Sequence, residues 1–308
     1  MSLDRLLAAG PLTENPPTRM RGYLGYLELI RPANVATALA DVLAGYAVAG
    51  LGNHSALGWL LLSTACLYAG GVVLNDVFDR ELDRIERPER PIPSGRVSVG
   101  GASGLGGGLL AFGVFAGAQA TAAAGVVAAA TAASVLLYDA WGKRQGLLGP
   151  VNMGMCRGLN LLLGIAATPS MLAETWPLAL LPLVYIAAVT AVSRGEVHGG
   201  RRAIGAFALI SLSGVLVALL ALAVRHAGGS WAGAGFTALL AWRVLPAFWG
   251  AYQTPEPGAI RHATRTGVLS LVLLDAAIGA TYGGALYSLV IVATGLVASS
   301  LARRFAVT

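Results

Sequence analysis

Long apolar runs separated by short polar connections are the main pattern along this chain. A helix needs about 20 apolar residues to cross the hydrocarbon core of a bilayer, with a usual range of about 17–25. Eight segments reach or nearly reach that length, and each predicts one membrane-crossing helix. These segments run at about 33–50, 56–74, 101–119, 121–138, 147–167, 175–192, 203–224 and 231–251.

A further apolar region, at about 267–302, is too long for one helix. Gly283 and Gly284, which have polar neighbours, divide it into two shorter spans. Lipid offers no hydrogen bonds to the backbone, so a spanning segment must be a helix that satisfies its own polar groups. The sequence therefore predicts an all-α fold, a polytopic membrane helical bundle of nine to ten transmembrane helices.

The polar segments set the boundaries of this bundle. The connections are short except at 75–100, 193–202 and 252–266. Residues 1–25 contain three prolines and several charges, and no apolar run there ends in a small-residue cleavage site. We expect a mobile N-terminal arm over 1–25, with a short interfacial turn near residues 3–7, and a single transmembrane domain over 26–305.

Composition agrees with lipid as the main solvent. Hydrophobic residues make up 56% of the chain and charged residues only 12%, whereas soluble domains carry about 25% charged residues. Cys66 and Cys156 lie in apolar stretches with no second Cys or His at ligand spacing. We therefore expect two free thiols and neither a disulfide framework nor a zinc site.

The basic residues predict the orientation of the helices. Of the 21 Lys and Arg residues, 18 lie in alternate connections, and this asymmetry places those connections and the N-terminus in the cytoplasm. An even count of ten spans follows if Arg303 and Arg304 are also cytoplasmic. The arginines are not interleaved with aromatic residues on one soluble face, so no nucleic-acid partner is expected.

The densest cluster of acidic residues follows the second predicted span. Six of the 15 acidic residues lie between positions 76 and 89. In a continued helix Asp76, Asp79 and Asp83 occupy positions i, i+3 and i+7, so their carboxylates share one face. Mg²⁺ suits such a set, because it binds one or two carboxylates and completes its octahedron with phosphate oxygens. The arginines downstream are suited to grip a diphosphate.

The segment has two other possible interpretations. An interfacial helix stabilised by i, i+4 ion pairs, Asp76–Arg80 and Asp83–Arg87, remains open. The aspartate pattern of CDP-alcohol phosphotransferases has a Gly after its first Asp and an Ala-Arg pair downstream. This segment has neither, which excludes that family.

The segment resembles the first aspartate-rich motif of the UbiA prenyltransferase superfamily. The likeness covers Asn75-Asp76-x-x-Asp79-x-x-x-Asp83 and its continuation from Arg87 to Arg96. Three further likenesses follow the family's order: Arg31-Pro32-Ala33-Asn34, Tyr138 to Lys143-Arg144, and Gly149-Pro150-x-Asn152. The resemblance covers about residues 25–300 and implies Mg²⁺-dependent transfer of an isoprenyl group from its diphosphate to an acceptor.

The resemblance, together with the charge and position of single residues, gives the candidates for the site. The catalytic and metal-binding candidates are Asp76, Asp79, Asp83 and Glu196. The substrate-binding candidates are Asn34, Asn75, Arg87, Arg90, Tyr138, Lys143, Arg144, Asn152, Arg157, Arg194, His198 and Arg201.

The second motif of the family departs from its pattern here. The family expects a pair of aspartates after the sixth span, but Val192 occupies the first position and only Glu196 supplies a carboxylate. Without the second aspartate pair, less metal is available to neutralise a bound diphosphate. Arg194, His198 and the Arg201–Arg202 pair are candidates to supply part of that positive charge. His198 could equally be a residue at a helix end that faces water. Arg201 and Arg202 could equally be basic residues that only set the orientation of the helices in the membrane. The run from Ser193 to Gly200 is similar to the EboC branch of UbiA-like proteins, linked to secondary-metabolite precursors.

Four charged residues lie inside apolar segments: Asp41, Arg157, Arg243 and Asp275. Each costs about 2.5–3.5 kcal/mol on insertion scales, so each is expected to face the interior of the bundle. Arg157 is placed to reach the diphosphate site. An Asp275–Arg243 pair is expected to hold two helices together.

These observations lead to two functional hypotheses. The first is an integral-membrane prenyltransferase that uses Mg²⁺, an isoprenyl diphosphate and a lipophilic or aromatic acceptor. The second is a UbiA-like protein without transferase activity, which binds or helps export a lipophilic precursor, with other Ebo proteins as partners. The incomplete second motif favours the second hypothesis.

Overall fold

The computed structural model describes residues 18–226 and 229–304, and every regular element in these ranges is helical. The side chains of residues 18–23, 33, 34, 298, 299 and 301–304 are outside this description. The elements are α2 (Thr18–Ile30), α3 (Pro32–Val48), α4 (His54–Phe78), α5 (Arg80–Glu86), α6 (Val99–Ala120), α7 (Ala122–Ala140), η1 (Gly142–Arg144), α8 (Leu148–Ile165), α9 (Pro169–Thr175), η2 (Trp176–Ala179), α10 (Leu180–Ser193), α11 (Arg202–Arg225), α12 (Trp231–Gln253) and α13 (Pro257–Arg304).

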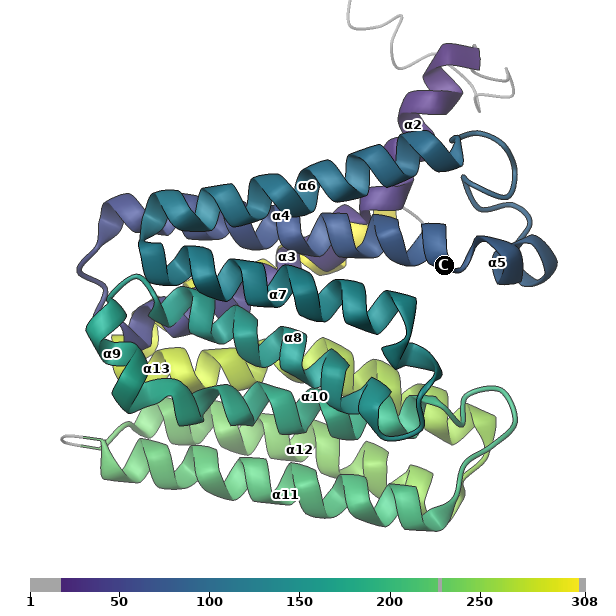
Figure 1. Ribbon diagram of the computed structural model, residues 1–308. Helices are drawn as coiled ribbons and strands as arrows, with labels where there is room; N and C mark the ends of the chain where they lie inside the picture. The colour runs from purple at the N-terminus through teal and green to yellow at the C-terminus, as the bar shows by residue number, and fades with distance from the viewer. Residues whose placement is uncertain (1–17, 227–228, 305–308) are drawn as a thin grey trace, which may run out of the picture.

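The long helices lie side by side and form one bundle (Figure 1). Helix α4 packs against α6, α3 against α8 and α13, and α12 against α11 and α13. Helices α4, α7 and α10 all finish at the same end of the bundle, at the right of Figure 1. The loops at 79–98, 141–147 and 194–201 lie there, and we call this the charged end. It gathers segments that are far apart in the sequence.

Helix α13 reverses direction at Gly284, as the sequence predicts. Gly284 has φ 84° and ψ 171°, a conformation that a residue with a side chain rarely adopts. The two arms of α13 pack antiparallel, because Gly279 lies against Ile291 and Gly295 against Val272. The described chain thus contains ten long helical rods if the two arms are counted separately.

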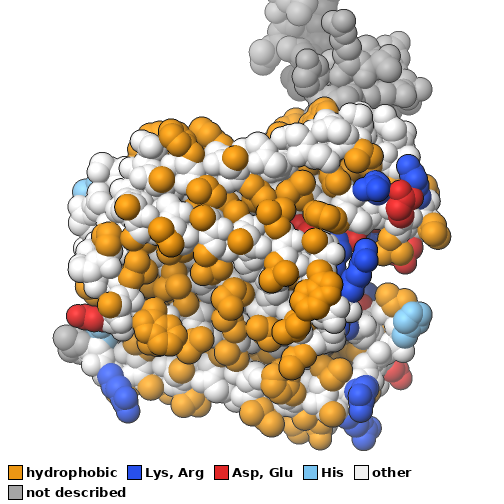
Figure 2. All heavy atoms as spheres, in the orientation of Figure 1, with side chains coloured by type: hydrophobic (Ala, Val, Ile, Leu, Met, Phe, Trp, Pro, Cys, Tyr) orange, Lys and Arg blue, Asp and Glu red, His pale blue; other side chains and the backbone are white. Residues whose placement is uncertain are grey.

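The distribution of hydrophobic and charged side chains over the surface is typical of a membrane protein. Six helices in the described part of the chain are long and apolar enough to cross a bilayer by length and composition. Figure 2 shows a broad face covered mainly by hydrophobic side chains, with most charged side chains gathered at the charged end. The expected membrane helical bundle is confirmed.

Two boundaries differ from the sequence expectation. The long connection expected at 252–266 is short, because α13 already begins at Pro257. Arg261, His262 and Arg265 lie in the first turns of this helix. Proline is favoured in the first turn of a helix, and these polar residues continue it. Residues 18–25, expected as part of the N-terminal arm, belong to α2, while the turn expected at residues 3–7 lies outside the described residues.

Helices α3 and α8 approach each other closely through two glycines. A Cβ atom on Gly45 would overlap the carbonyl oxygen of Leu161, and one on Gly164 would overlap that of Val42. Small residues permit such backbone contact between membrane helices. This contact brings Arg157 and Asn160 of α8 against Asp41 of α3.

Candidate functional site

The acidic segment lies where α4 ends at the charged end. Helix α4 finishes at Phe78, Asp79 caps it, and α5 continues the chain with Asp83 on its buried side. Arg90 reaches back from the following loop: its Nη1 atom lies 2.8 Å from Asp83 Oδ2 and 3.4 Å from Asp76 Oδ1. Asp76 and Asp83 are both 4% exposed, so one nearly buried guanidinium joins two nearly buried carboxylates.

Arg31 is a second cation on this cluster, and the sequence analysis did not assign it to the site. Its Nη2 atom lies 2.7 Å from Asp76 Oδ1. Arg31 has φ 49°, in the left-handed region, and precedes Pro32, which starts α3. A residue before proline is kept out of the right-handed helical region, so the chain bends here between α2 and α3. The Arg31-Pro32 motif was the available signal for this role.

Asp79 pairs with a different cation. Lys143, in η1 after α7, places Nζ 2.6 Å from Asp79 Oδ1. The η1 turn is held by Arg194 from the loop after α10, whose Nη2 donates to the carbonyl oxygens of Lys143 and Gln145. Arg194 therefore supports the loop that carries Lys143, and these two contacts are to backbone oxygens.

The i, i+4 ion pairs considered for this segment do not form. Asp76 and Asp83 pair with Arg31 and Arg90, and Arg80 and Arg84 both lie against Glu81 on the exposed side of α5. The interfacial-helix interpretation therefore accounts for only the outer face of α5. The inner face pairs instead with Arg90 from the following loop and with Arg31, which precedes α3.

Asp139 adds a fourth carboxylate that the sequence analysis missed. It lies near the end of α7, is 3% exposed, and accepts a hydrogen bond of 2.7 Å from Asn75 Nδ2. Lys143, Asp79 and Asp76 are close enough to act on its charge. The only sequence signal was its position directly after Tyr138, inside the Tyr138-to-Lys143 match.

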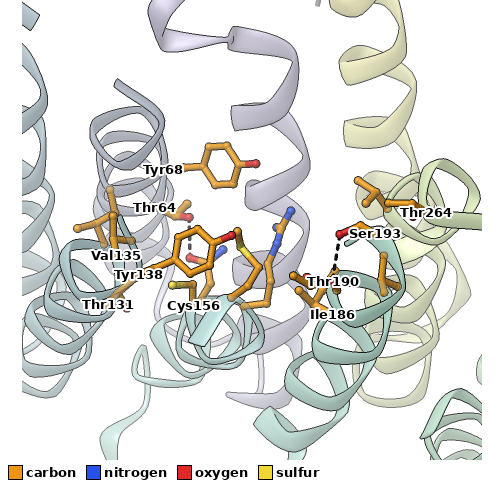
Figure 3. A pocket seen from close by; sticks show the side chains of 16 residues that line it. Thr64, Tyr68, Thr131, Val135, Tyr138, Cys156, Ile186, Thr190, Ser193 and Thr264 are labelled. Carbon is orange, nitrogen blue, oxygen red and sulfur yellow. Dashed lines mark hydrogen bonds between the residues drawn. The ribbon is translucent and has the colours of Figure 1, made fainter. Parts of the chain in front are cut away.

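A cavity of about 320 Å³ opens between α4, α7, α8, α10 and α13 (Figure 3). Figure 3 shows Tyr68 and Tyr138 on one side and Thr190, Ser193 and Thr264 on the other. Its lining is mostly apolar, and Arg157 and Asn160 supply polar groups from α8. Tyr138 connects the cavity to the acidic cluster, because it lines the cavity and directly precedes Asp139 on α7, and the charges of Asp79 and Asp139 act on its phenol.

Several predicted residues lie elsewhere. Glu196 is half-buried, and its carboxylate makes no polar contact within the described chain, although its backbone oxygen accepts from Arg261. Arg87 and His198 are exposed, and Arg201 lines a separate cavity of about 190 Å³ beside the loop after α10. Arg144 is exposed in a surface groove with Asp79 and Lys143.

The two predicted pocket asparagines have different outcomes. The Asn152 amide is hydrogen-bonded to the Ser134 hydroxyl at 2.6 Å and so ties α8 to α7; it is not among the residues that line the cavity. The side chain of Asn34 lies outside the described residues.

Arg157 pairs with Asp41 inside the bundle, at 2.7 Å from Nη1 to Oδ2. Asp275 is fully buried next to Asp41, and neither of its oxygens has a hydrogen-bond donor in the described chain. The expected Asp275–Arg243 pair is wrong. Helix α12 buries Leu240, Val244 and Ala247, and Arg243 falls beside this stripe with an exposed side chain.

The donor set is compatible with a hard divalent cation. The four aspartates of the cluster, Asp76, Asp79, Asp83 and Asp139, all offer oxygen, the ligand atom that Mg²⁺ prefers. Within the described residues no three carboxylate, His or Cys side chains are grouped to hold a metal by themselves. Mg²⁺ needs only one or two carboxylates when phosphate oxygens complete its shell. The buried Oδ2 of Asp139, which has no partner, fits such a ligand.

Several curated relatives of the chain are named digeranylgeranylglyceryl phosphate synthase. The digeranylgeranylglyceryl phosphate synthase of Ignicoccus hospitalis is 35% identical over 175 residues, 56% of this chain and 57% of the relative. That of Methanoculleus marisnigri is 27% identical over 259 residues, 79% of this chain and 92% of the relative. The chain spans about half the length of several such relatives, 50% in Metallosphaera sedula.

Solved structures and a family profile complete the comparison. An apo UbiA homologue from Aeropyrum pernix gives a TM-score of 0.66 at 16% identity, covering 79% of this chain and 96% of the homologue. A UbiA homologue from Archaeoglobus fulgidus, bound to DMAPP and Mg²⁺, gives 0.58 at 17% identity, covering 87% and 99%. These likenesses show the fold. The profile of the UbiA prenyltransferase family matches residues 38–261, and the chain therefore belongs to that family.

Proposed function

We propose that this protein is an integral-membrane prenyltransferase that moves an isoprenyl group from its diphosphate to a lipophilic or aromatic acceptor. The observation that carries the proposal is the placement of the acidic cluster directly beside an apolar cavity, with Tyr138 between them. A diphosphate needs cations around it, and a prenyl chain needs apolar walls. The two requirements meet at one end of the bundle.

The cations of the site are suited to hold the diphosphate. Arg31, Arg90 and Lys143 surround the carboxylates and come from three separate segments of the chain. A guanidinium that already pairs with a carboxylate can also donate to a phosphate oxygen, because it has five N–H groups. When bound, Mg²⁺ would neutralise the charge of the leaving diphosphate. Asp76, Asp79 and Asp83 would hold it, with Asn75 assisting.

The cavity would protect the reacting carbon. Breaking the allylic carbon–oxygen bond leaves a carbocation, and capture by an acceptor hydroxyl or aromatic carbon forms the new bond and releases a proton from the acceptor. The apolar walls from Leu67, Val135 and Ile186 would keep water from competing with the acceptor. The rings of Tyr68 and Tyr138 offer electron-rich faces to a cation.

The proposed test is Mg²⁺-dependent release of diphosphate from a panel of prenyl diphosphates, with products identified by mass spectrometry. Asp79→Asn should abolish release and remain folded, because it removes one of several like charges. Arg225→Gln, at the opposite end of the bundle, is the matched control and should keep wild-type rates. Release that ignores Mg²⁺ or survives Asp79→Asn would contradict the proposal.

The second candidate is a protein that binds or helps export a lipophilic precursor without transferring a prenyl group. The half-buried Glu196, whose carboxylate makes no contact with the acidic cluster, favours it. The resemblance to the EboC branch and the idea of Ebo partners belong to this candidate. Binding of a prenyl diphosphate with no product from any acceptor would select it.

A further inference from the structure

The Asp139 carboxylate is almost fully buried, and only one of its two oxygens has a hydrogen-bond partner in the described chain. Its Oδ1 atom accepts the hydrogen bond from Asn75, but Oδ2 is buried and has no partner in the described chain. The residue is 3% exposed, so bulk water does not take that place. A buried carboxylate oxygen without a donor is unfavourable, and native proteins usually give it a partner.

The charges around Asp139 leave this oxygen without a cation of its own. Asp76 and Asp79 approach from α4, and Lys143 approaches from η1. The Lys143 ammonium is 2.6 Å from Asp79, and Arg31 and Arg90 are paired with Asp76 and Asp83. Two further carboxylates thus act on the charge of Asp139, and the nearby Lys143 ammonium is already paired with Asp79. Such a group favours a bound cation, because like charges repel in a medium of low dielectric constant.

The second motif of the family does not fill this need. Val192, at the position expected for the first aspartate, is a buried apolar residue on α10. The Glu196 side chain makes no polar contact with any residue of the acidic cluster in the described chain. A carboxylate on the other side of the site must therefore come from another helix, and α7 supplies one in Asp139.

We propose that Asp139 is a metal-binding residue of the diphosphate site, holding Mg²⁺ opposite Asp79 in place of the incomplete second motif. The inference rests on the proposed function, since it requires a metal and a diphosphate at the charged end. The ligand is a hard divalent cation together with diphosphate oxygens, and the unpartnered Oδ2 atom is the coordinating atom.

A structural role makes a different prediction. The Asn75–Asp139 hydrogen bond also ties α4 to α7, and it would do so without any metal. Asp139→Asn keeps the shape of the side chain but removes its charge. If Asp139 only links the two helices, Asp139→Asn should change the stability of the protein and leave its affinity for the cation at the wild-type value.

The experiment measures binding of Mn²⁺, used as a paramagnetic probe for Mg²⁺, to the full-length protein in nanodiscs with inorganic pyrophosphate present. Electron paramagnetic resonance counts free and bound Mn²⁺. Asp139→Asn should weaken binding by about tenfold or more. Ser134→Ala breaks a buried hydrogen bond on the same helix without removing a charge, and Glu174→Gln removes a carboxylate at the opposite end; both should bind as the wild type does.

The possible results distinguish the metal-binding role of Asp139 from the proposed prenyltransferase function. Wild-type affinity in Asp139→Asn, with binding lost in Asp79→Asn, overturns the role of Asp139 and leaves the diphosphate site intact. No Mn²⁺–pyrophosphate binding by the wild type overturns both. If Asp139→Asn does not fold, anomalous scattering from wild-type crystals with Mn²⁺ and pyrophosphate decides. A peak at Asp139 Oδ2 supports the inference, and a peak held only by Asp76, Asp79 or Asp83 rejects it.

Discussion

The Arg157 guanidinium lies 2.7 Å from the Asp41 carboxylate, between two helices whose glycines allow the backbones to touch. Asn160 donates to the same Asp41 oxygen at 2.9 Å. The other buried acid nearby, Asp275, has no such donor. Two carboxylates thus stand beside one guanidinium, and only one of them is paired.

This asymmetry predicts opposite effects of two similar substitutions. Asp41→Asn leaves Arg157 buried without its partner and should lower stability by about 3–5 kcal/mol. Asp275→Asn replaces a buried carboxyl that has no ion pair in the described chain by a neutral amide able to donate to Asp41, and it should leave the melting temperature unchanged or raise it. Thermal unfolding in detergent compares the two variants directly. Equal losses from both would show that Asp275 has a partner equivalent to Arg157.

Two neighbouring arginines offer a test of the cation arrangement. Arg90 is 9% exposed and contacts two carboxylates, whereas Arg87 is exposed and its side chain makes no polar contact in the described chain. Arg90→Gln should weaken pyrophosphate binding by about 10–100-fold, the range expected for losing charge-assisted hydrogen bonds. Arg87→Gln is its matched control. Isothermal titration calorimetry gives both affinities, and a larger effect at Arg87 would contradict the arrangement.

The contact between α3 and α8 predicts a packing defect. Gly45→Val would force the side chain into the Leu161 backbone and should cost about 1–3 kcal/mol or more. Gly214→Ala, on α11, meets open space and should be neutral or stabilising by a few tenths of a kcal/mol. Thermal unfolding measures both. A stable Gly45→Val protein would mean that the two helices can separate without loss.

The predicted orientation can be tested by labelling single cysteines. Ser98 and Ser55 are both exposed and lie at opposite ends of the bundle, before α6 and at the start of α4. In a background with Cys66→Ala and Cys156→Ser, a membrane-impermeant maleimide should reach Ser55→Cys from outside sealed cells. Ser98→Cys should react only after the membrane is opened. Reaction of both from one side would reject the orientation.

The helices were predictable because lipid leaves a chain few alternatives. The starts and ends of the rods follow the apolar runs closely, and even the reversal at Gly284 could be read from paired glycines. The connection at 252–266 was misjudged because polar residues at a membrane surface can continue a helix as easily as they can end it.

The pairings inside the site were less predictable, since they depend on distances between helices. Asp76, Asp83 and Arg90 are close in the sequence, and their grouping follows from the motif. Asp139 lies 64 positions after its partner Asn75, and only the packing of α7 against α4 brings the two together. Arg243 shows the converse, because it lies on the exposed side of α12 while Asp275 is fully buried.

The reversal at Gly284 also bears on how the protein is made. Its two arms can meet face to face only after both have been made, and the second arm follows every other described helix in the sequence. The hairpin can therefore close only after the other described helices have been made, with Tyr287 donating to the Leu43 carbonyl oxygen of α3. Helix α3 and the last described helix thus pack against each other, and a chain cut short before Gly284 would lose the Tyr287 contact with α3.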